Sequence, residues 1–274
     1  MTPAWTARHW GVMPERGWPR RTWVAEWLTL GDGTWFARID PEGDPGLPPI
    51  VMLHGLVVSG AYFRPVAAHL DDRYRLYIPD LPGYGRSPSS RIWSLPELAD
   101  HVARWMEVHA LGPSVIAGNS LGCQVATLLA VRRPELVAGL VLVAPTMDPA
   151  VRGPIRAMVR GALDIPRERQ TLWRIWIPDL LRAGLRRALT TLAWSIADPQ
   201  RDRLADIRQP TLVVGGARDP IVPPGWVEAM AAAMPQARAI VLPGSPHAMN
   251  YSAPRELARA IDTALTGYLE RMTP

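Results

Sequence analysis

Six short apolar runs recur through the chain after residue 49, and segments with helical spacing separate them. A continuous apolar run of this kind is typical of a strand that helices cover on both faces. Strands that alternate with amphipathic helices predict a mostly parallel, doubly wound α/β sheet. The runs are 50–53, 74–78, 114–117, 140–143, 211–214 and 239–242, and the helical segments are 60–70, 95–110, 121–133, 225–234 and 254–270.

The N-terminal part of the chain has a different pattern. Residues 22–30 and 34–39 are rich in β-formers and flank Gly31-Asp32-Gly33, which predicts a hairpin. Residues 1–20 hold tryptophans and prolines without any periodicity. We expect this segment to form an extended arm laid over the body of the protein, and an interfacial contact is the alternative.

One long stretch, residues 146–205, interrupts the alternation because it holds no strand pattern. Its apolar residues recur at helical spacing. The expected helices span 152–163, 167–177 and 179–197. The chain of 274 residues is long enough for one α/β domain with an insertion. We therefore predict a core domain made of 1–145 and 206–274, with 146–205 as a helical insertion between two core strands.

Polar residues able to carry chemistry follow several of the predicted strands. Ser120, Asp219 and His247 each follow a different strand and occur in that order along the chain. In open parallel sheets, ligands bind in the crevice beyond the carboxyl ends of the strands. We therefore expect these three side chains to meet at one edge of the sheet. The other residues that follow strands are His54, Asp80 and Asp148.

Ser120 lies in the pentapeptide Gly118-Asn119-Ser120-Leu121-Gly122, directly after an apolar run. Alone, this pentapeptide fits an ordinary turn as well as a strained strand-to-helix corner that exposes a nucleophile. Together with the other residues that follow strands, it resembles the α/β-hydrolase fold family over residues 22–270. The resemblance is carried by His54-Gly55, by Asp80-Leu81-Pro82-Gly83-Tyr84-Gly85, by the pentapeptide, and by Asp219 and His247 in later loops.

The resemblance implies a sheet of the α/β-hydrolase type, with residues 146–205 as a helical cap over the active site. It also implies the triad order Ser120, Asp219, His247. A serine hydroxyl needs a base within hydrogen-bond reach and an acid that orients the base. We assign His247 as the base and Asp219 as the acid, and Asp148 remains an alternative acid.

The backbone N–H groups of Leu121 and Leu56 are the expected oxyanion donors. Leu121 begins the helix after Ser120, and a helix N-terminus directs its amides toward developing negative charge. Leu56 belongs to the loop that begins with His54-Gly55. We expect His54 to hold this loop through backbone hydrogen bonds rather than to act in catalysis.

The expected reaction is hydrolysis of a carboxylic ester of an apolar small molecule through an acyl-serine intermediate. Two alternatives stay open: cleavage of a carbon–carbon bond in a ring-fission product, which the elbow also resembles, and a ligand-binding homologue without turnover. Met158 and four further residues are expected to form an apolar underside of the insertion. Those four, which are candidates for a substrate pocket, are Met147, Trp173, Trp176 and Trp194.

Arginines are the commonest charged residues of the insertion, and we expect them on its solvated outer face. Contact with an acidic substrate is the alternative. The arginines concerned are Arg152, Arg156, Arg160, Arg174, Arg182, Arg186 and Arg187.

The composition narrows the function class. Cys123 is the only cysteine, so an intramolecular disulfide and a cysteine zinc site are excluded. No phosphate loop or dinucleotide fingerprint is present, so no cofactor is expected. The chain has no lysine, and its arginines are spread along its length, which does not favour a nucleic-acid partner. No run approaches the length of a membrane span, and no signal peptide is evident, so a cytoplasmic location is expected.

Overall fold

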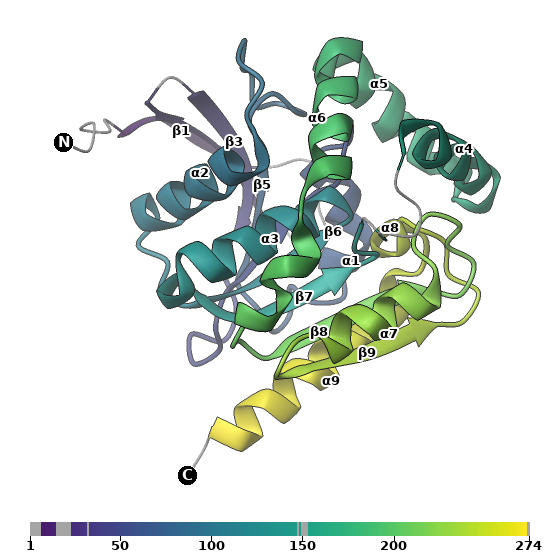
Figure 1. Ribbon diagram of the computed structural model, residues 1–274. Helices are drawn as coiled ribbons and strands as arrows, with labels where there is room; N and C mark the ends of the chain where they lie inside the picture. Colours follow the sequence, from purple (N-terminus) through teal and green to yellow (C-terminus); the bar gives the residue numbers. More distant parts are fainter. Residues whose placement is uncertain (1–6, 15–22, 32, 147, 149–152, 273–274) are drawn as a thin grey trace.

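The computed structural model describes residues 7–14, 23–31, 33–146, 148 and 153–272. Within these residues, nine strands form one sheet in the order β1-β2-β3-β5-β4-β6-β7-β8-β9 (Figure 1). The strands from β5 through β9 run parallel. This arrangement confirms the predicted, mostly parallel α/β sheet. The strand bounds are β1 Ala7–Pro14, β2 Val24–Leu30, β3 Gly33–Asp40, β4 Ile50–Leu53, β5 Leu76–Asp80, β6 Ser114–Asn119, β7 Val137–Val143, β8 Thr211–Gly216 and β9 Ala237–Leu242.

The antiparallel edge of the sheet contains the predicted hairpin. β2 and β3 pair from Val24↔Ile39 to Leu30↔Gly33, and β3 then pairs antiparallel with β5. The expectation of an arm laid over the body is wrong for residues 7–14, which form β1 and pair antiparallel with β2. Without β1, the edge of β2 would leave backbone N–H and C=O groups unpaired, and β1 satisfies them. Backbone pairing of this kind does not require a periodic pattern of side chains, so the sequence of residues 7–14 does not reveal the strand.

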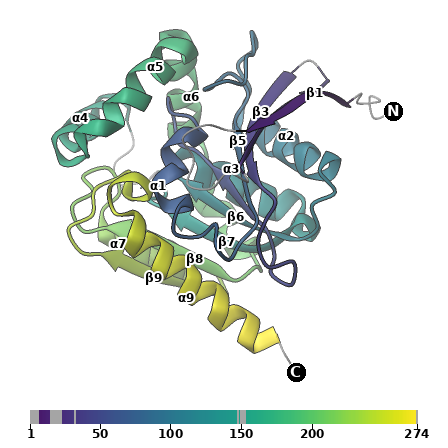
Figure 2. The ribbon, with the colours of Figure 1, turned by 180° about the vertical axis from the view of Figure 1, so that it is seen from behind.

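Helices cover both faces of the sheet. Figure 1 shows α2, α3 and α7 in front of it, and Figure 2, seen from behind, shows α1 and α9 on the other face. The buried side chains between these layers form one apolar core that includes every residue of β4. The helix bounds are α1 Arg64–Ala67, α2 Leu95–Val108, α3 Leu121–Arg132, α7 Pro224–Ala232, α8 Met249–Ser252 and α9 Pro254–Met272.

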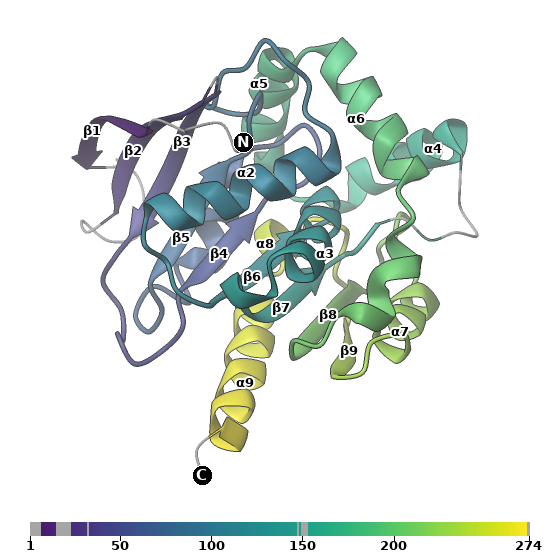
Figure 3. The ribbon, with the colours of Figure 1, turned by 60° about the vertical axis from the view of Figure 1, so that its left-hand side comes forward.

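The segment between β7 and β8 is helical. Its helices are α4 Pro154–Asp164, α5 Trp173–Ala183 and α6 Leu185–Ala197, and 3-10 turns at 165–167, 170–172 and 200–206 complete it. We refer to α4, α5 and α6 as the insertion helices. They lie together beyond one end of the sheet (Figures 1 and 3).

The break between the second and third insertion helices is not where the sequence pattern put it. The expected helices 167–177 and 179–197 leave residue 178 between them, but Pro178 lies inside α5. The helix ends instead before Gly184, whose φ of +76° is a left-handed conformation that favours glycine. The glycine therefore sets the corner between α5 and α6.

Strand register brings the catalytic candidates to one edge. Leu53 of β4 pairs with Gly118 of β6, and Asn119 pairs with Val143 of β7. Val143 pairs in turn with Val214 of β8, so the parallel strands end nearly level with one another. The loops that follow β4, β6, β8 and β9 therefore emerge side by side, at the carboxyl edge of the sheet.

The loop after β5 is fixed by a buried ion pair. Asp80 Oδ1 accepts hydrogen bonds from Arg38 Nη1 at 2.6 Å and from the Gly60 N–H at 2.7 Å. Its other oxygen accepts the Arg86 N–H at 2.9 Å. Arg38 and Asp80 are both buried. Asp80 thus has a structural role: its carboxylate holds the loop after β5 to Arg38 and Gly60.

Among the described residues, none of the helices combines the length and the apolar character needed to cross a membrane.

Candidate active site

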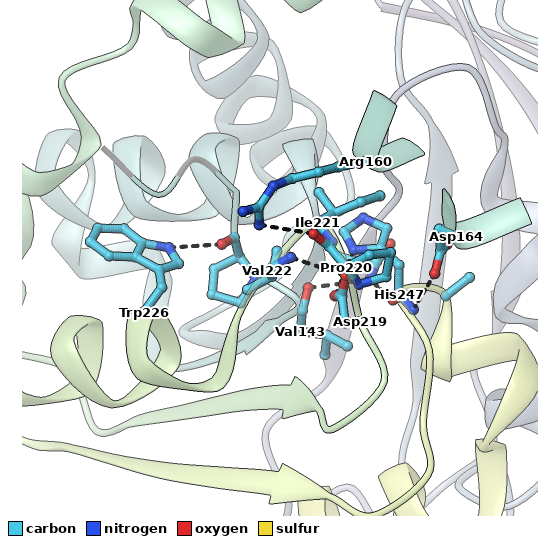
Figure 4. A network of polar contacts seen from close by, with 12 residues as sticks. Val143, Arg160, Asp164, Asp219, Pro220, Ile221, Val222, Trp226 and His247 are labelled. Carbon is cyan, nitrogen blue, oxygen red and sulfur yellow. Dashed lines mark hydrogen bonds and ion pairs between the residues drawn. The ribbon is translucent and has the colours of Figure 1, made fainter. Parts of the chain in front are cut away.

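His247 and Asp219 form a hydrogen-bonded pair at the carboxyl edge of the sheet. The Nδ1 of His247 lies 2.8 Å from Oδ2 of Asp219, and Figure 4 shows the two side chains together. The other carboxylate oxygen of Asp219 accepts the backbone N–H groups of Ile221 at 2.7 Å and Val222 at 3.0 Å. These two bonds fix the carboxylate so that Oδ2 faces the imidazole.

The surroundings of His247 make its ring a strong base. Burial alone would lower the pKa of His247, but the charge and hydrogen bond of Asp219 oppose this effect. The charges of Asp164 and Glu168 add to that of Asp219, and together they raise the pKa of His247 to about 9.

Ser120 occupies a strained corner between β6 and α3. Its φ of +55° and ψ of −118° are rare for a residue with a Cβ, and such strain is typically stored at functional sites. The corner is tight: a Cβ on Gly122 would lie 2.0 Å from the carbonyl oxygen of Leu53, and one on Gly118 would lie 2.5 Å from the backbone of Gly122. Both glycines are needed because their neighbours are backbone atoms.

The loop with the expected oxyanion donor Leu56 approaches this corner. A Cβ added to Gly55 would lie 3.2 Å from the Cβ of Ser120. Val57, the next residue after Leu56, has a φ of +53°, so the loop turns sharply there. Leu121, the other expected donor, is the first residue of α3. Gly55, which precedes Leu56, and Leu121 therefore both adjoin Ser120.

His54 holds this loop through its ring nitrogens. Its Nε2 accepts the N–H of Leu81 at 2.8 Å, so its Nδ1 carries the proton and donates to the carbonyl oxygen of Gly55 at 2.8 Å. Desolvation lowers the pKa of His54, which favours this neutral form. The contacts match the structural role predicted for His54.

Tyr62 is a site residue that the sequence pattern missed. Its hydroxyl oxygen accepts the Gly55 N–H at 2.9 Å and its proton goes to Oδ1 of Asn119 at 2.7 Å. Asn119 Nδ2 in turn donates to the carbonyl oxygens of Val143 at 3.2 Å and His247 at 3.5 Å. The hydroxyl therefore joins the oxyanion loop to the serine corner, and the amide joins that corner to the histidine loop.

Two carboxylates near the C-terminal end of α4 were also missed. Asp164 Oδ1 accepts the backbone N–H of His247 at 3.3 Å, on the side of the histidine away from Asp219 (Figure 4). Glu168 Oε1 accepts the N–H of Ala248 at 2.5 Å, and its other oxygen accepts the hydroxyl of Ser252. Burial raises the pKa of Asp164 to about 7. The insertion therefore contacts the histidine loop directly.

The residues expected on the apolar underside of the insertion differ in burial. Trp173 and Trp176 are half-buried at the start of α5, with ring centroids 5.2 Å apart in an edge-to-face contact, and Trp176 also packs against the core. Trp194 is half-buried in α6. Met147 lies outside the described residues. The expectation for Met158 is wrong, because this side chain is exposed rather than turned to the underside.

The insertion arginines divide into two groups. Arg156, Arg174, Arg182 and Arg186 are exposed, as expected, and Arg152 lies outside the described residues. The prediction is wrong for Arg187, which is only 7% exposed and donates to the carbonyl oxygens of Arg91 at 2.7 Å and Ser89 at 2.5 Å.

Arg160 is half-buried and donates to the carbonyl oxygen of Pro220 at 2.9 Å. This bond is drawn in Figure 4. In both Arg160 and Arg187, backbone carbonyls replace water around the guanidinium, which makes its burial tolerable. These two arginines dock the insertion onto the core.

Cys123, three residues after Ser120, is buried in α3. Its Sγ donates to the carbonyl oxygen of Gly118 at 3.2 Å, and burial raises the pKa of its thiol far above the usual range. A buried thiol that stays protonated is a poor nucleophile.

The chain is similar in sequence to a known protein family and to several characterised proteins. Residues 50–260 match the profile of the alpha/beta hydrolase family. The chain is 29% identical to the pimeloyl-[acyl-carrier protein] methyl ester esterase of Nitrosomonas europaea over 82% of its own length and 99% of that protein. It is 34% identical to lipase LipV of Mycobacterium tuberculosis over 59% of its length and 57% of that protein.

A solved structure of similar fold is that of a hydrolase from Pseudomonas aeruginosa PA01. It superposes with a TM-score of 0.76 at 22% identity, over 88% of this chain and 98% of that one. The family profile covers most of the chain, and the relatives are esterases and lipases. The chain therefore belongs to the alpha/beta hydrolase family, as an esterase-like hydrolase.

Proposed function

We propose that the protein hydrolyses a carboxylic ester through an acyl-enzyme formed on Ser120. The observation that carries this proposal is the buried His247–Asp219 pair, 2.8 Å between Nδ1 and Oδ2, at the sheet edge where Ser120 occupies its strained corner. The arrangement leaves Nε2 of His247 as the basic atom available to a hydroxyl. This is the chemistry that a serine nucleophile requires.

In the first half-reaction, Ser120 Oγ attacks the ester carbon while Nε2 of His247 takes the hydroxyl proton. A new C–O bond forms and the carbonyl π pair moves onto oxygen. The tetrahedral intermediate then expels the alkoxide, which leaves as an alcohol after it receives the proton from His247. Asp219 stays ionised and stabilises the imidazolium.

In the second half-reaction, a water molecule gives a proton to His247 and attacks the acyl carbon. The acid product leaves when the proton returns to Ser120 Oγ. The N–H groups of Leu121 and Leu56 are assigned to the oxyanion in both steps, Leu121 with the added field of the α3 N-terminus. Tyr62 holds the Leu56 loop through the Gly55 N–H.

The relatives and the insertion support a proposal for the substrate class. The similar proteins are an esterase for a methyl ester of an acyl group on a carrier protein and a lipase, which supports an ester with an apolar acyl chain. The segment 146–205 is assigned as the cap over the site. Trp173, Trp176 and Trp194, with Met147, are assigned to the side of the acyl chain.

The test is a panel of p-nitrophenyl esters of increasing acyl length, assayed with the parent, Ser120→Ala and Ser90→Ala. Ser90 is an exposed serine in a loop and serves as the matched control. We expect turnover by the parent and by the Ser90 variant, and none by Ser120→Ala. A fluorophosphonate probe should label the same two active proteins.

Two outcomes would contradict the proposal. A folded parent that neither turns over any ester nor reacts with the probe would favour a ligand-binding homologue. Faster turnover of a vinylogous diketone than of every ester would favour carbon–carbon bond cleavage.

A further inference from the structure

Many of the large apolar side chains of the insertion segment are exposed to solvent. Nine of the ten large apolar side chains that are exposed in the described part of the chain lie between residues 155 and 189. In a helix packed on a core, the apolar stripe is expected to face inward. Ile175 and Trp176 of α5 pack against the core, but these nine side chains face solvent, so their exposure needs an explanation.

Helix α4 shows the inversion most clearly. Ile155, Val159 and Leu163 recur at four-residue spacing and form one stripe, and Ile155 is 76% exposed. The polar side chains Arg160 and Asp164 face the body instead, where they bond to the Pro220 carbonyl and to the His247 N–H.

Helices α5 and α6 repeat the pattern. Leu181 is 75% exposed and Leu185 is 68% exposed, on either side of the corner at Gly184. The buried residues of these helices are instead largely polar: they include Asp179, Arg187, Thr191 and Ser195. Thr191 accepts a hydrogen bond from the Tyr84 hydroxyl at 3.0 Å.

The exposed charges among these apolar stripes are of one sign. Arg156, Arg174, Arg182 and Arg186 are all exposed. The acidic side chains of the insertion helices, Asp164 and Asp179, are buried, and Glu168 bonds to the histidine loop. The outer surface therefore combines aliphatic side chains with guanidinium groups and presents no exposed carboxylate from α4, α5 or α6.

We propose that this outer surface docks on an anionic lipid bilayer. Aliphatic side chains on helix stripes insert at the boundary between headgroups and acyl chains, while arginine side chains reach lipid phosphates. The guanidinium binds a phosphate through two parallel hydrogen bonds. Docking there would bring the acyl-ester site, as proposed above, close to a source of apolar substrate, but docking itself does not depend on that function.

The observations favour lipid over a protein partner. A two-fold contact with a second copy places the same patch against itself, so the arginines of the two copies would face one another. Protein interfaces are enriched in aromatic side chains at their centres. The exposed large apolar residues of the insertion are all aliphatic or methionine.

The experiment is co-sedimentation of the full chain with vesicles of phosphatidylcholine alone or mixed with an equal part of phosphatidylglycerol. We expect binding to the mixed vesicles that is about tenfold or more tighter than to phosphatidylcholine and that weakens with added salt. The double variant Leu181→Ser with Leu185→Ser should lose several-fold in binding without any change in thermal unfolding.

Two sets of arginine substitutions test whether anionic vesicles bind the insertion helices specifically or are attracted by the positive charge of the whole protein. The triple variant Arg156→Gln, Arg174→Gln, Arg186→Gln should lose the preference for anionic vesicles. The matched triple Arg201→Gln, Arg208→Gln, Arg255→Gln, which neutralises exposed arginines outside the insertion helices, should keep it. All variants are checked by circular dichroism before binding is measured.

Three results would overturn the proposal. The first is a parent that does not bind anionic vesicles. The second is an equal loss of binding in the two arginine triples. The third is a dimer in light scattering that the Leu181→Ser, Leu185→Ser variant converts to a monomer.

Discussion

The backbone N–H of His247 donates to Oδ1 of Asp164 at 3.3 Å, so a carboxylate from the insertion touches the loop that presents the proposed base. The contact joins residues that are 83 positions apart. It couples the placement of α4 to the placement of His247, and the Asp164 charge also raises the pKa of the His247 ring. The site therefore has a second carboxylate that acts on the histidine, besides Asp219.

Asp164→Asn should move the acidic limb of the pH profile. The asparagine oxygen can still accept the His247 N–H, but the charge that raises the histidine pKa is gone. The base works only when neutral, so kcat/KM of the parent should rise through the histidine pKa of about 9. In the variant this rise should shift to lower pH, by up to about one unit.

The control for this shift is Asp206→Asn, which removes an exposed carboxylate in the 3-10 turn after the insertion helices. Its profile should match that of the parent. A profile of Asp164→Asn that also matches the parent, in a folded protein, would show that Asp164 does not act on the base.

Asp219→Asn should lower kcat by about 10³–10⁴-fold with a smaller change in KM. The asparagine NH₂ group would donate to Nδ1 of His247 and leave the ring in the wrong tautomer. Single-turnover assays with a p-nitrophenyl ester measure this loss. Asp148→Asn tests the alternative acid, and a comparable loss there would move the acid assignment to Asp148.

Gly122→Ala should damage the serine corner. Its Cβ would lie 2.0 Å from the Leu53 carbonyl oxygen, so β4 and α3 must separate. We expect a loss of about 1–3 kcal/mol in the free energy of unfolding and about a hundredfold fall in kcat/KM. Urea unfolding and ester assays provide the two measurements.

The matched control is Gly161→Ala, since nothing lies within 4 Å of the added Cβ in α4. Alanine should be neutral or stabilise the protein by about 0.5–1 kcal/mol there. Equal effects of the two substitutions would contradict the steric account of Gly122.

Asp80→Ala should cost about 3–5 kcal/mol of the free energy of unfolding, because it leaves the buried guanidinium of Arg38 without its carboxylate. Asp100→Ala removes an exposed pair with Arg132 and should cost at most about 1 kcal/mol. Urea denaturation of both variants measures the difference. A similar, small loss in both would mean that burial adds nothing to the Arg38–Asp80 pair.

The sequence predicts the site where its signals are local. Apolar runs marked the parallel strands, and Ser120 was found because its corner needs glycines within two residues of it. His247 and Asp219 were found because each follows a strand. Tyr62 and Asp164 were missed because their partners, Asn119 and His247, are 57 and 83 residues away. Such contacts leave no periodic signal.

The insertion shows a second limit of prediction from sequence. Periodicity at Leu181, Leu185 and Leu189 predicted the helices, since a stripe needs only regular spacing. It carried no information on the direction that the stripe faces. In the structure these three side chains are exposed, while the buried positions of α5 and α6 include the polar groups Asp179 and Arg187.

The burial of Cys123 makes the chain convenient for spectroscopy. It is the only cysteine in the sequence, and in the folded protein its thiol is protonated and shielded from solvent. Maleimide reagents should therefore leave the native protein unmodified. A cysteine introduced at any exposed position would be the single reactive thiol, so a fluorophore or spin label could be attached there without first removing a native one.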